Sequence, residues 1–486
     1  MDTVSSSQFA NNALWRFIDV ISRKIIALGI SIVLARLIAP EAYGIVALTT
    51  VFITFSDIFI LNGFNIALIR KDVVSSTDYS TVTYLSLIFT TVMYLVFYIT
   101  SPFIASFYEC DILSPVLRVI TILLFFESVS SVIRAYATRE LQFKKMALSS
   151  FISNVASGLL ALILAFEGFG VWALVVQQVC ANFLDMSIMS IIFRWRVRPT
   201  FSIDSAKSMT KFTMGVLGTS FLDFFGNNVC SLIIGKTYTT KDLGYYNRAN
   251  LFPETIGLNA YSSINSVLLP TLASRQSDIE GMKRVARKVM SLTEYIILPL
   301  MFGLMAIADN LINLLLTEKW APAIPMMYFC CLYYAINPIR AISYSIFYSM
   351  AKSKTTMYIE LIRSLLMVSG IILVAIIFKM GLIYVLLANL LISIFVALQA
   401  QFEVYKLISY SIRELVEDIF PSLMLSLIML VIVYSESLLS LGRVSQLVIQ
   451  IFTGLVVYVA LSIIARNKNF IILVDFLKQK FSQWKH

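Results

Sequence analysis

About fourteen apolar stretches, each long enough to cross a membrane, follow one another through this 486-residue chain. A helix needs about 20 apolar residues to cross the hydrocarbon core of a bilayer, so these stretches occupy most of the sequence. Charged residues make up only 14% of the chain, against roughly 25% in soluble proteins. Because the hydrocarbon offers no hydrogen-bonding partners, each stretch is predicted to be an α-helix. The sequence therefore predicts an all-α polytopic membrane protein.

The distribution of Lys and Arg predicts how the chain crosses the membrane. The predicted spans begin near Ala13, Tyr43, Ser80, Leu113, Met146, Val171, Phe212, Asn250, Val289, Met326, Met357, Leu382, Leu415 and Gln446. With a cytoplasmic N-terminus, most Lys and Arg outside the spans fall in the inner connections, which places both termini in the cytoplasm. The formal charge of +10 is then explained by topology, and a nucleic-acid partner is not expected.

Two parts of the sequence, two hundred residues apart, resemble each other. "LARLIAPEAYG" ends at Gly44, and "IIGKTYTTKDLG" ends at Gly244 with the same placement of turn, basic residue and glycine. We interpret this as a duplication of six helices, a common plan among transporters. The predicted lobes are residues 1–200 (helices 1–6) and 205–404 (helices 7–12). Residues 405–465 form helices 13 and 14, and the basic tail 466–486 is predicted to lie along the membrane surface.

Motifs for enzymatic, metal or nucleotide chemistry are missing from the sequence. The only histidine is His486, and the five cysteines show no spacing typical of metal ligands. "GKT" at residues 235–237 resembles the end of a phosphate-binding loop, but the glycine required five positions earlier is Cys230. We therefore expect no enzymatic activity, no cofactor, no metal site and no use of ATP.

Charged side chains within the spans are costly, by roughly 2.5–3.5 kcal/mol each, and usually face protein or a wet cavity. Arg16, Asp19 and Arg23 share one face of the first span, beside Lys24, unless these side chains reach the headgroups instead. Tyr333, Asn337, Arg340 and Tyr344 share one face of the tenth span. Arg363 is spaced to pair with Glu360, where a structural ion pair is as good an interpretation as a functional one.

Arg and Lys bind phosphate, and amides and Tyr bind sugar hydroxyls, although amides in membranes more often bond neighbouring helices. The candidate substrate-binding residues are Arg16, Arg23, Lys24, Arg118, Arg340 and Arg363. The candidate sugar contacts are Asn182, Asn227, Tyr333, Asn337 and Tyr344. The candidates for ion coupling are Asp19, Asp57, Glu127 and Asp223. For the acids, a hydrogen-bonded structural role is an equal alternative.

The strings "LARLIAPEAYG", "NGFNIALIR", "RELQFKK", "FGVWALV" and "FRWRVRPTFS" resemble the polysaccharide transporter family of the MOP exporter superfamily, the Wzx-like flippases. The resemblance implies a two-lobed bundle in a bacterial cytoplasmic membrane that opens alternately to either side. The implied substrate is an undecaprenyl-pyrophosphate-linked repeat unit for O-antigen, capsule or exopolysaccharide. It also implies a cationic lumen, supplied here by Arg23, Lys24 and Arg340, and partners among polysaccharide polymerases and assembly proteins.

Two other functions are compatible with parts of this pattern. A cation-coupled antiporter of small molecules, from the same superfamily, would be favoured by a lumen dominated by acids. A membrane-embedded polymerase or acyltransferase would be expected to show a large outer loop or a histidine within the membrane. The longest outer connection is about fifteen residues long and no span contains histidine, so this class is disfavoured.

Overall fold

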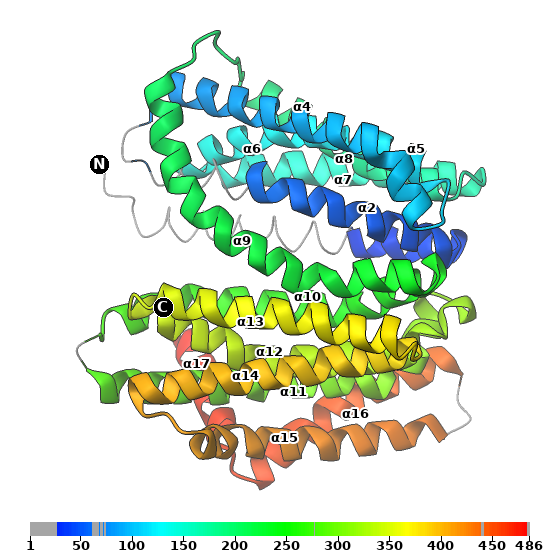
Figure 1. Ribbon diagram of the computed structural model, residues 1–486. Coiled ribbons are helices and arrows are strands. Elements are labelled where there is room, and N and C mark those ends of the chain that lie inside the picture. Colours follow the sequence, from blue (N-terminus) through cyan, green and yellow to red (C-terminus); the bar gives the residue numbers. More distant parts are fainter. Residues whose placement is uncertain are drawn as a thin grey trace. The chain divides into compact units, whose positions relative to one another are not determined.

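The computed structural model describes residues 27–60, 68, 71, 74–276, 278–438 and 442–483. Every regular element within these residues is a helix, as predicted. The chain divides into two compact units, Met1–Gly244 and Tyr245–His486. Figure 1 shows that each unit consists of helices packed side by side.

Unit 1 is built from seven labelled helices and a shorter apolar one. The short helix is Ala27–Leu37. The labelled helices are α2 (Pro40–Phe59), α4 (Ser76–Phe107), α5 (Leu113–Ile120), α6 (Leu123–Arg139), α7 (Phe143–Phe166), α8 (Val171–Ile192) and α9 (Ile203–Thr237). The start of α10 (Thr240–Ala273) also belongs to this unit.

Unit 2 contains the rest of α10 and the remaining helices. These are α11 (Ile279–Leu315), η2 (Glu318–Trp320), α12 (Ala323–Ser349), α13 (Ser353–Ile372), η3 (Leu373–Ile377), α14 (Leu382–Ile408), α15 (Ile412–Ser435), η4 (Glu436–Leu438), α16 (Arg443–Ile464) and α17 (Lys468–Gln483). The core of unit 2 joins side chains from α10 to α15, with Phe347, Ile359 and Val404 fully buried.

Among the described residues, ten helices are long and apolar enough to cross a membrane, rather than the fourteen predicted. The first predicted span begins near Ala13, outside the described residues. Three further predicted spans correspond to α9, α10 and α12, which have 35, 34 and 27 residues but are less apolar than the ten. α10 and α12 carry polar side chains such as Glu254 and Arg340. The multi-pass membrane architecture is confirmed, and the count of fourteen is not.

Side-chain caps fix where several helices begin. Ser75 accepts a hydrogen bond from the backbone N–H of Asp78 (3.1 Å), and the Asp78 carboxylate accepts one from the backbone N–H of Ser75 (2.8 Å). This reciprocal cap satisfies two N–H groups that the first turn of α4 leaves free. Asp78 also accepts a 2.6 Å hydrogen bond from the Ser205 hydroxyl, which fastens the first turn of α9 to α4.

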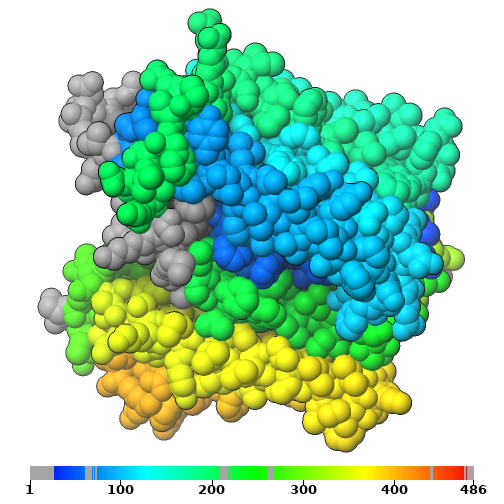
Figure 2. All heavy atoms as spheres, turned by 45° about the horizontal axis from the view of Figure 1, so that its top comes forward, coloured from blue at the N-terminus to red at the C-terminus, as the bar shows by residue number. Residues whose placement is uncertain are grey.

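Apolar side chains remain exposed over much of the surface. α4 forms a large part of the face of unit 1 that Figure 2 shows in blue. Its Ile99 and Phe103 are 66% and 73% exposed. In a water-soluble protein such a continuous apolar surface would drive aggregation, whereas in a bilayer it contacts lipid tails.

The two similar sequence segments meet within unit 1. A Cβ atom on Gly44 would lie 1.7 Å from the carbonyl oxygen of Thr240, and one on Gly244 would lie 2.0 Å from that of Pro40. The contact is reciprocal, because each glycine faces the first residue of the other helix. Only glycine permits this backbone approach, which explains why both segments end in one. The packing units divide after Gly244, since α9 packs against α2 and α4. The lobe boundaries at 200 and 404 remain a prediction about sequence repeats.

Candidate functional site

Helix α12 carries a line of polar residues into the interior of unit 2. Asn337, Arg340 and Tyr344 lie on one face, as their spacing predicts. One guanidinium nitrogen of Arg340, Nη2, donates a 2.9 Å hydrogen bond to Asn337 Oδ1. The guanidinium carbon also lies 5.5 Å from the centre of the Tyr344 ring.

Helix α13 completes this group with Glu360 and Arg363. Arg340 Nη1 donates to Glu360 Oε1 (2.7 Å), and so does the Tyr344 hydroxyl (2.8 Å). Arg363 Nε donates to the second oxygen of the same carboxylate (2.6 Å). The Arg363 side chain is 2% exposed and that of Arg340 is 18% exposed. We call Asn337, Arg340, Tyr344, Glu360 and Arg363 the arginine cluster.

The arginine cluster has more positive than negative charge. Two guanidinium groups share one carboxylate, so one positive charge is not balanced within the cluster. Burying such a charge is unfavourable, and a protein that retains one usually has a use for it. An anion with oxygen atoms able to take the forked donors of a guanidinium fits this excess.

A small pocket opens beside the cluster. It is lined by Gly257, Thr293, Ile297, Tyr334, Asn337, Pro338, Ala341 and Ile342. Asn337 belongs both to the wall of this pocket and to the arginine cluster, so its amide links the two. Pro338 lies within α12, where it removes a backbone N–H donor from the helix and favours a kink beside the pocket.

Unit 1 contains a second group of charges with the opposite balance. Asp57 of α2 and Glu127 of α6 each have one fully enclosed carboxyl oxygen with no hydrogen-bond partner among the described residues. Arg134, two turns along α6, forms a 2.5 Å ion pair with Asp185 of α8. The hydroxyl of Ser149 donates to Asp185 Oδ1 (2.8 Å). We call Asp57, Glu127, Arg134 and Asp185 the acidic cluster.

The remaining predicted residues lie elsewhere. Arg118 of α5 donates a 2.7 Å hydrogen bond to Ser101 and lies over the Tyr98 ring. Tyr333 packs edge-on against the Tyr334 ring rather than joining the arginine cluster. Asn182 donates to the carbonyl of Gln178 in its own helix (3.1 Å).

Two further predicted residues pair along one helix, and four fall outside the description. Asn227 donates to Asp223 Oδ1 (3.1 Å) along α9. Arg16, Asp19, Arg23 and Lys24 lie outside the described residues. Their roles remain predictions from the sequence.

Glu294 of α11 is a polar residue that the sequence analysis missed. Its side chain is 1% exposed, and neither carboxyl oxygen has a hydrogen-bond partner among the described residues. The one signal available in the sequence is a lone acid in a long apolar run, "SLTEYIILPL". Its neighbours Thr293 and Ile297 line the pocket.

Comparison with known proteins places the chain in a family. The sequence profile of a family described as "Polysaccharide biosynthesis protein" matches residues 33–325, more than half of the chain. The chain belongs to this family. The matched region covers the acidic cluster and ends before the arginine cluster, so the roles of residues 337–363 are argued from their geometry.

Two curated relatives of this polysaccharide biosynthesis protein are named for polymer production. The succinoglycan biosynthesis transport protein ExoT of Rhizobium meliloti (strain 1021) is 25% identical over 61% of this chain and 60% of its own length. The lipopolysaccharide biosynthesis protein WzxC of Escherichia coli (strain K12) is 22% identical over 85% of this chain and 84% of its own length. The match with ExoT thus spans about three-fifths of that relative.

A solved structure shares the fold of this family member. The lipid II flippase MurJ, in an inward closed conformation, superposes with a TM-score of 0.73 at 18% identity, covering 94% of this chain and 99% of that one. At this level of identity the likeness establishes the fold. The residues that act must be argued from this chain itself.

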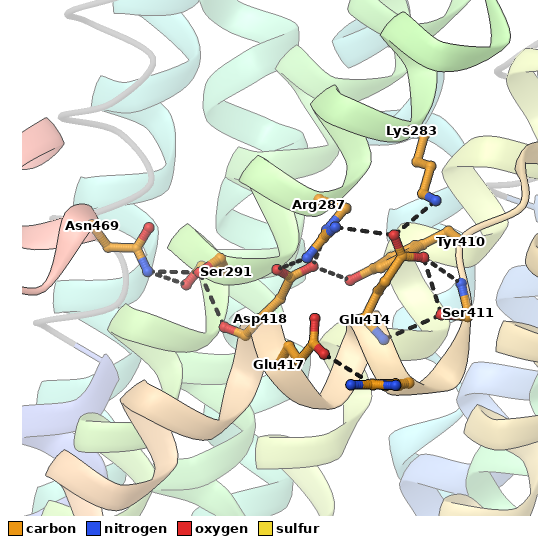
Figure 3. A network of polar contacts seen from close by, with 10 residues as sticks. Lys283, Arg287, Ser291, Tyr410, Ser411, Glu414, Glu417, Asp418 and Asn469 are labelled. Carbon is orange, nitrogen blue, oxygen red and sulfur yellow. Dashed lines mark hydrogen bonds and ion pairs between the residues drawn. The ribbon is translucent and has the colours of Figure 1, made fainter.

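Another polar network joins α11 to α15 (Figure 3). Arg287 donates two 2.8 Å hydrogen bonds to the two carboxylate oxygens of Asp418. Lys283 forms a 2.8 Å ion pair with Glu414, and the Tyr410 hydroxyl donates to Asp418 (2.8 Å). Unlike the two clusters above, this network pairs its acids and bases evenly.

The same network also fastens the last helix. Asn469, in the first turn of α17, donates a 2.7 Å hydrogen bond to the hydroxyl of Ser291, as Figure 3 shows. The Ser291 hydroxyl in turn donates to the backbone carbonyl of Asp418 (3.0 Å). We interpret the network as structural, because its hydrogen bonds from α11 to α15 and from α17 to α11 hold these helices against one another.

Proposed function

We propose that this protein is a flippase that moves undecaprenyl-pyrophosphate-linked oligosaccharide repeat units from the cytoplasmic to the outer leaflet, for O-antigen, capsule or exopolysaccharide synthesis. The observation that supports this most directly is the arginine cluster, in which one buried and one half-buried guanidinium group share the carboxylate of Glu360. A pyrophosphate is an anion whose paired oxygens match a guanidinium fork.

The surroundings of the arginine cluster fit a substrate with both a charged and a sugar-bearing part. Arg340 is the more exposed arginine and supplies the charge that meets the pyrophosphate. Asn337 lines the neighbouring pocket, and its amide is of a type that bonds sugar hydroxyls. Apolar helix surfaces remain available to the polyprenyl chain. The names of ExoT and WzxC, in succinoglycan transport and lipopolysaccharide biosynthesis, support the same substrate class.

The distribution of Lys and Arg supports the orientation, and the resemblance to the flippase family supports the partners. Both termini lie in the cytoplasm and the protein resides in the bacterial cytoplasmic membrane, where basic connections remain on the inner side. Outward movement of an anion is favoured in an inside-negative cell by roughly 2.3 kcal/mol per charge per 100 mV. The polymerase and assembly proteins that use the exported unit act on the outer side.

Deletion and rescue in the native bacterium test this function. In the deletion strain, lipid-linked repeat units should accumulate on the cytoplasmic face, and the wild-type gene should clear them. Arg340→Gln should fail to clear them, because losing a hydrogen bond to a charged group costs about 1.5–3 kcal/mol, or about ten- to a hundredfold in affinity. Arg443→Gln is the matched control, since Arg443 is 52% exposed and pairs with Glu318.

Two results would count against the proposal. Normal translocation in the deletion strain, without another flippase, would favour the small-molecule antiporter instead. Full rescue by Arg340→Gln would show that the arginine cluster does not bind the substrate, even if the protein is a flippase. Normal membrane levels of the variant, measured by immunoblot, ensure that loss of rescue reports on transport.

A further inference from the structure

Helix α11 carries two rows of basic side chains in its first three turns. Lys283 and Arg287 form one row, and both make ion pairs with acids of α15. Arg284 and Lys288 form the second row, one position further around the helix, and both are exposed. Within the described part of the chain, neither of these two takes part in an ion pair. The first row fastens α11 to α15, whereas the second presents two positive charges to the surroundings.

Helix α17 is fastened beside the second row. Its Asn469 donates a 2.7 Å hydrogen bond to the Ser291 hydroxyl of α11, as Figure 3 shows. Arg284, Lys288 and Ser291 are spaced i, i+4 and i+7, so they share one face of α11. Lys468, which precedes Asn469 in the first turn of α17, is exposed. The docking of α17 therefore brings a third base to the end of α11 that carries the second row.

The second row lies where α11 leaves the hydrocarbon. At 37 residues this helix is about 55 Å long, whereas the hydrocarbon core of a bilayer is only about 30 Å thick. Side chains four residues apart form a ridge along a helix, and one such ridge leads from Lys288 to Ile296 and Leu300. Ile296 and Leu300 are 43% and 44% exposed. Charged surface thus changes to lipid-facing apolar surface along a single ridge.

The end of α16 adds apolar surface on the same side of α11. The hydroxyl of Tyr295, one turn after Ser291, donates a 2.7 Å hydrogen bond to the hydroxyl of Ser462. Ile463 and Ile464 follow directly and are 56% and 78% exposed. Two helices therefore offer apolar side chains to lipid next to the exposed bases.

The acids near these bases are too few to balance them. Asp278 caps α11 by accepting a 2.8 Å hydrogen bond from the backbone N–H of Gly281. Glu280 of α11 and Asp475 of α17 are exposed, and among the described residues neither takes part in an ion pair. Arg466, just before α17, is a fourth exposed base. This end of α11 and α17 thus keeps an excess of positive charge.

We propose that Arg284 and Lys288 of α11, together with Lys468 of α17, bind the headgroup of an anionic phospholipid from the surrounding bilayer. The phosphodiester oxygens accept charge-assisted hydrogen bonds from these bases. The acyl chains lie along the apolar side chains that begin with Ile296 and Leu300. A zwitterionic lipid carries its own ammonium group, which the three bases repel. A lipid with net negative charge is therefore preferred.

A headgroup bound here connects α17 to α11. Lys288 and Lys468 carry the same charge on either side of the hydrogen bond between Ser291 and Asn469. An anion between them offsets their repulsion, so the bound lipid stabilises the docking of α17. The site does not depend on the flippase function proposed above, because the lipid is a resident of the bilayer and is not transported.

Lipid binding is tested by native mass spectrometry of the purified full-length protein in an uncharged detergent. The protein is titrated with phosphatidylglycerol or with phosphatidylcholine of the same acyl chains, and the wild type should bind phosphatidylglycerol more tightly. Arg284→Gln combined with Lys288→Gln should weaken this binding about thirtyfold, or about fivefold for each base. The same double variant should leave binding of phosphatidylcholine unchanged.

Two matched variants separate the site from general surface charge and from misfolding. Lys406→Gln combined with Arg413→Gln removes two bases that already pair with Glu403 and Glu417, so it should leave phosphatidylglycerol binding within about twofold. The charge-conserving swap of Arg284→Lys with Lys288→Arg should retain tight binding.

Hydrogen exchange of the α17 backbone tests the connection between the helices. Phosphatidylglycerol should slow exchange in α17 of the wild type, and it should have no such effect on the double glutamine variant. Undiminished binding by that variant, equal binding of the two lipids, or an equal loss in the Lys406 and Arg413 control would overturn the site. Displacement of the lipid by inorganic phosphate, at an ionic strength matched with chloride, would show a site for free anions and would equally overturn the assignment to a bilayer lipid.

Discussion

In unit 2 the arginine cluster sets two guanidinium groups against the single carboxylate of Glu360, whereas in unit 1 the acidic cluster sets three carboxyl groups against the single guanidinium of Arg134. Each cluster lies among membrane helices, where an uncompensated charge is costly. The arginine cluster reduces its excess by binding an anion. The acidic cluster can reduce its excess by binding a proton, because carboxylates titrate and guanidinium groups do not.

This difference identifies the residue on which each cluster depends. Glu360 is the single acid of the arginine cluster and Arg134 is the single base of the acidic cluster, and each contacts several residues of opposite charge or polarity. When one of the more numerous charges is removed instead, another residue of the same charge remains in the cluster. Four measurements, from the largest expected effect to the smallest, test whether the two clusters are opposites in this sense.

Glu360→Gln should give the largest loss of stability. The change removes the carboxylate that Arg340 and Arg363 share, and breaking a buried pair typically costs about 3–5 kcal/mol. The free energy of unfolding in mixed detergent micelles measures the effect. Glu403→Gln, in which Lys406 loses a partly exposed partner, should cost less than about 1 kcal/mol. Equal losses in the two variants would show that Glu360 does not hold the arginine cluster together.

Arg134→Gln should give the next largest effect. It removes the only base of the acidic cluster and leaves Asp185 with the hydroxyl of Ser149. Arg134 is 27% exposed, so we expect roughly 2–3 kcal/mol rather than the full cost of breaking a buried pair. Arg413→Gln is the control, because Arg413 is 89% exposed in its pair with Glu417. A loss no larger than that of the control would mean that the acids are already neutral without Arg134.

Local spacing predicted part of the arginine cluster. The repeat of Asn337, Arg340 and Tyr344 along α12 requires only helical periodicity, and the structure places them on one face. The pairing of Arg363 with Glu360 follows from their i, i+3 spacing. That both arginines converge on one carboxylate depends on how α12 packs against α13. Such packing between helices cannot be predicted from a single sequence without covarying positions.

The same reason explains what the sequence did not reveal in unit 1. Asp57 and Glu127 were each predicted as acids within spans, but seventy residues separate them and nothing local places them in one cluster. Glu294 was missed because one acid in an apolar run has no partner spacing to detect. Asn182 was assigned to sugar on residue type alone, and the structure shows its amide bonded within its own helix.

Asp185→Asn should cost less than Arg134→Gln, about 1–2 kcal/mol, because the amide oxygen can still accept from Arg134 while its NH2 group donates to the Ser149 hydroxyl. Arg134 also retains the nearby Glu127. A double-mutant cycle with Arg134→Gln sharpens the comparison, since groups in direct contact usually couple by about 0.5–3 kcal/mol. If Asp185→Asn lowered the free energy of unfolding more than Arg134→Gln, the acidic cluster would depend on one of its three acids rather than on its single base. The two clusters would then not be opposites.

The smallest effect is expected outside both clusters, at Glu109 between α4 and α5. Its side chain is 83% exposed and accepts a 2.9 Å hydrogen bond from Lys236, which lowers the pKa of Glu109 below its usual 4.5. A lowered pKa in the folded state means that the pair stabilises the protein at neutral pH and stops doing so as pH falls through the lowered value. The difference in unfolding midpoint between wild type and Glu109→Gln should therefore be small at neutral pH, vanish in acid and shrink in high salt. Glu360→Gln should keep more of its effect in high salt, because that carboxylate is only 10% exposed. If salt weakened both variants equally, burial would not be what distinguishes the arginine cluster from an ordinary surface ion pair.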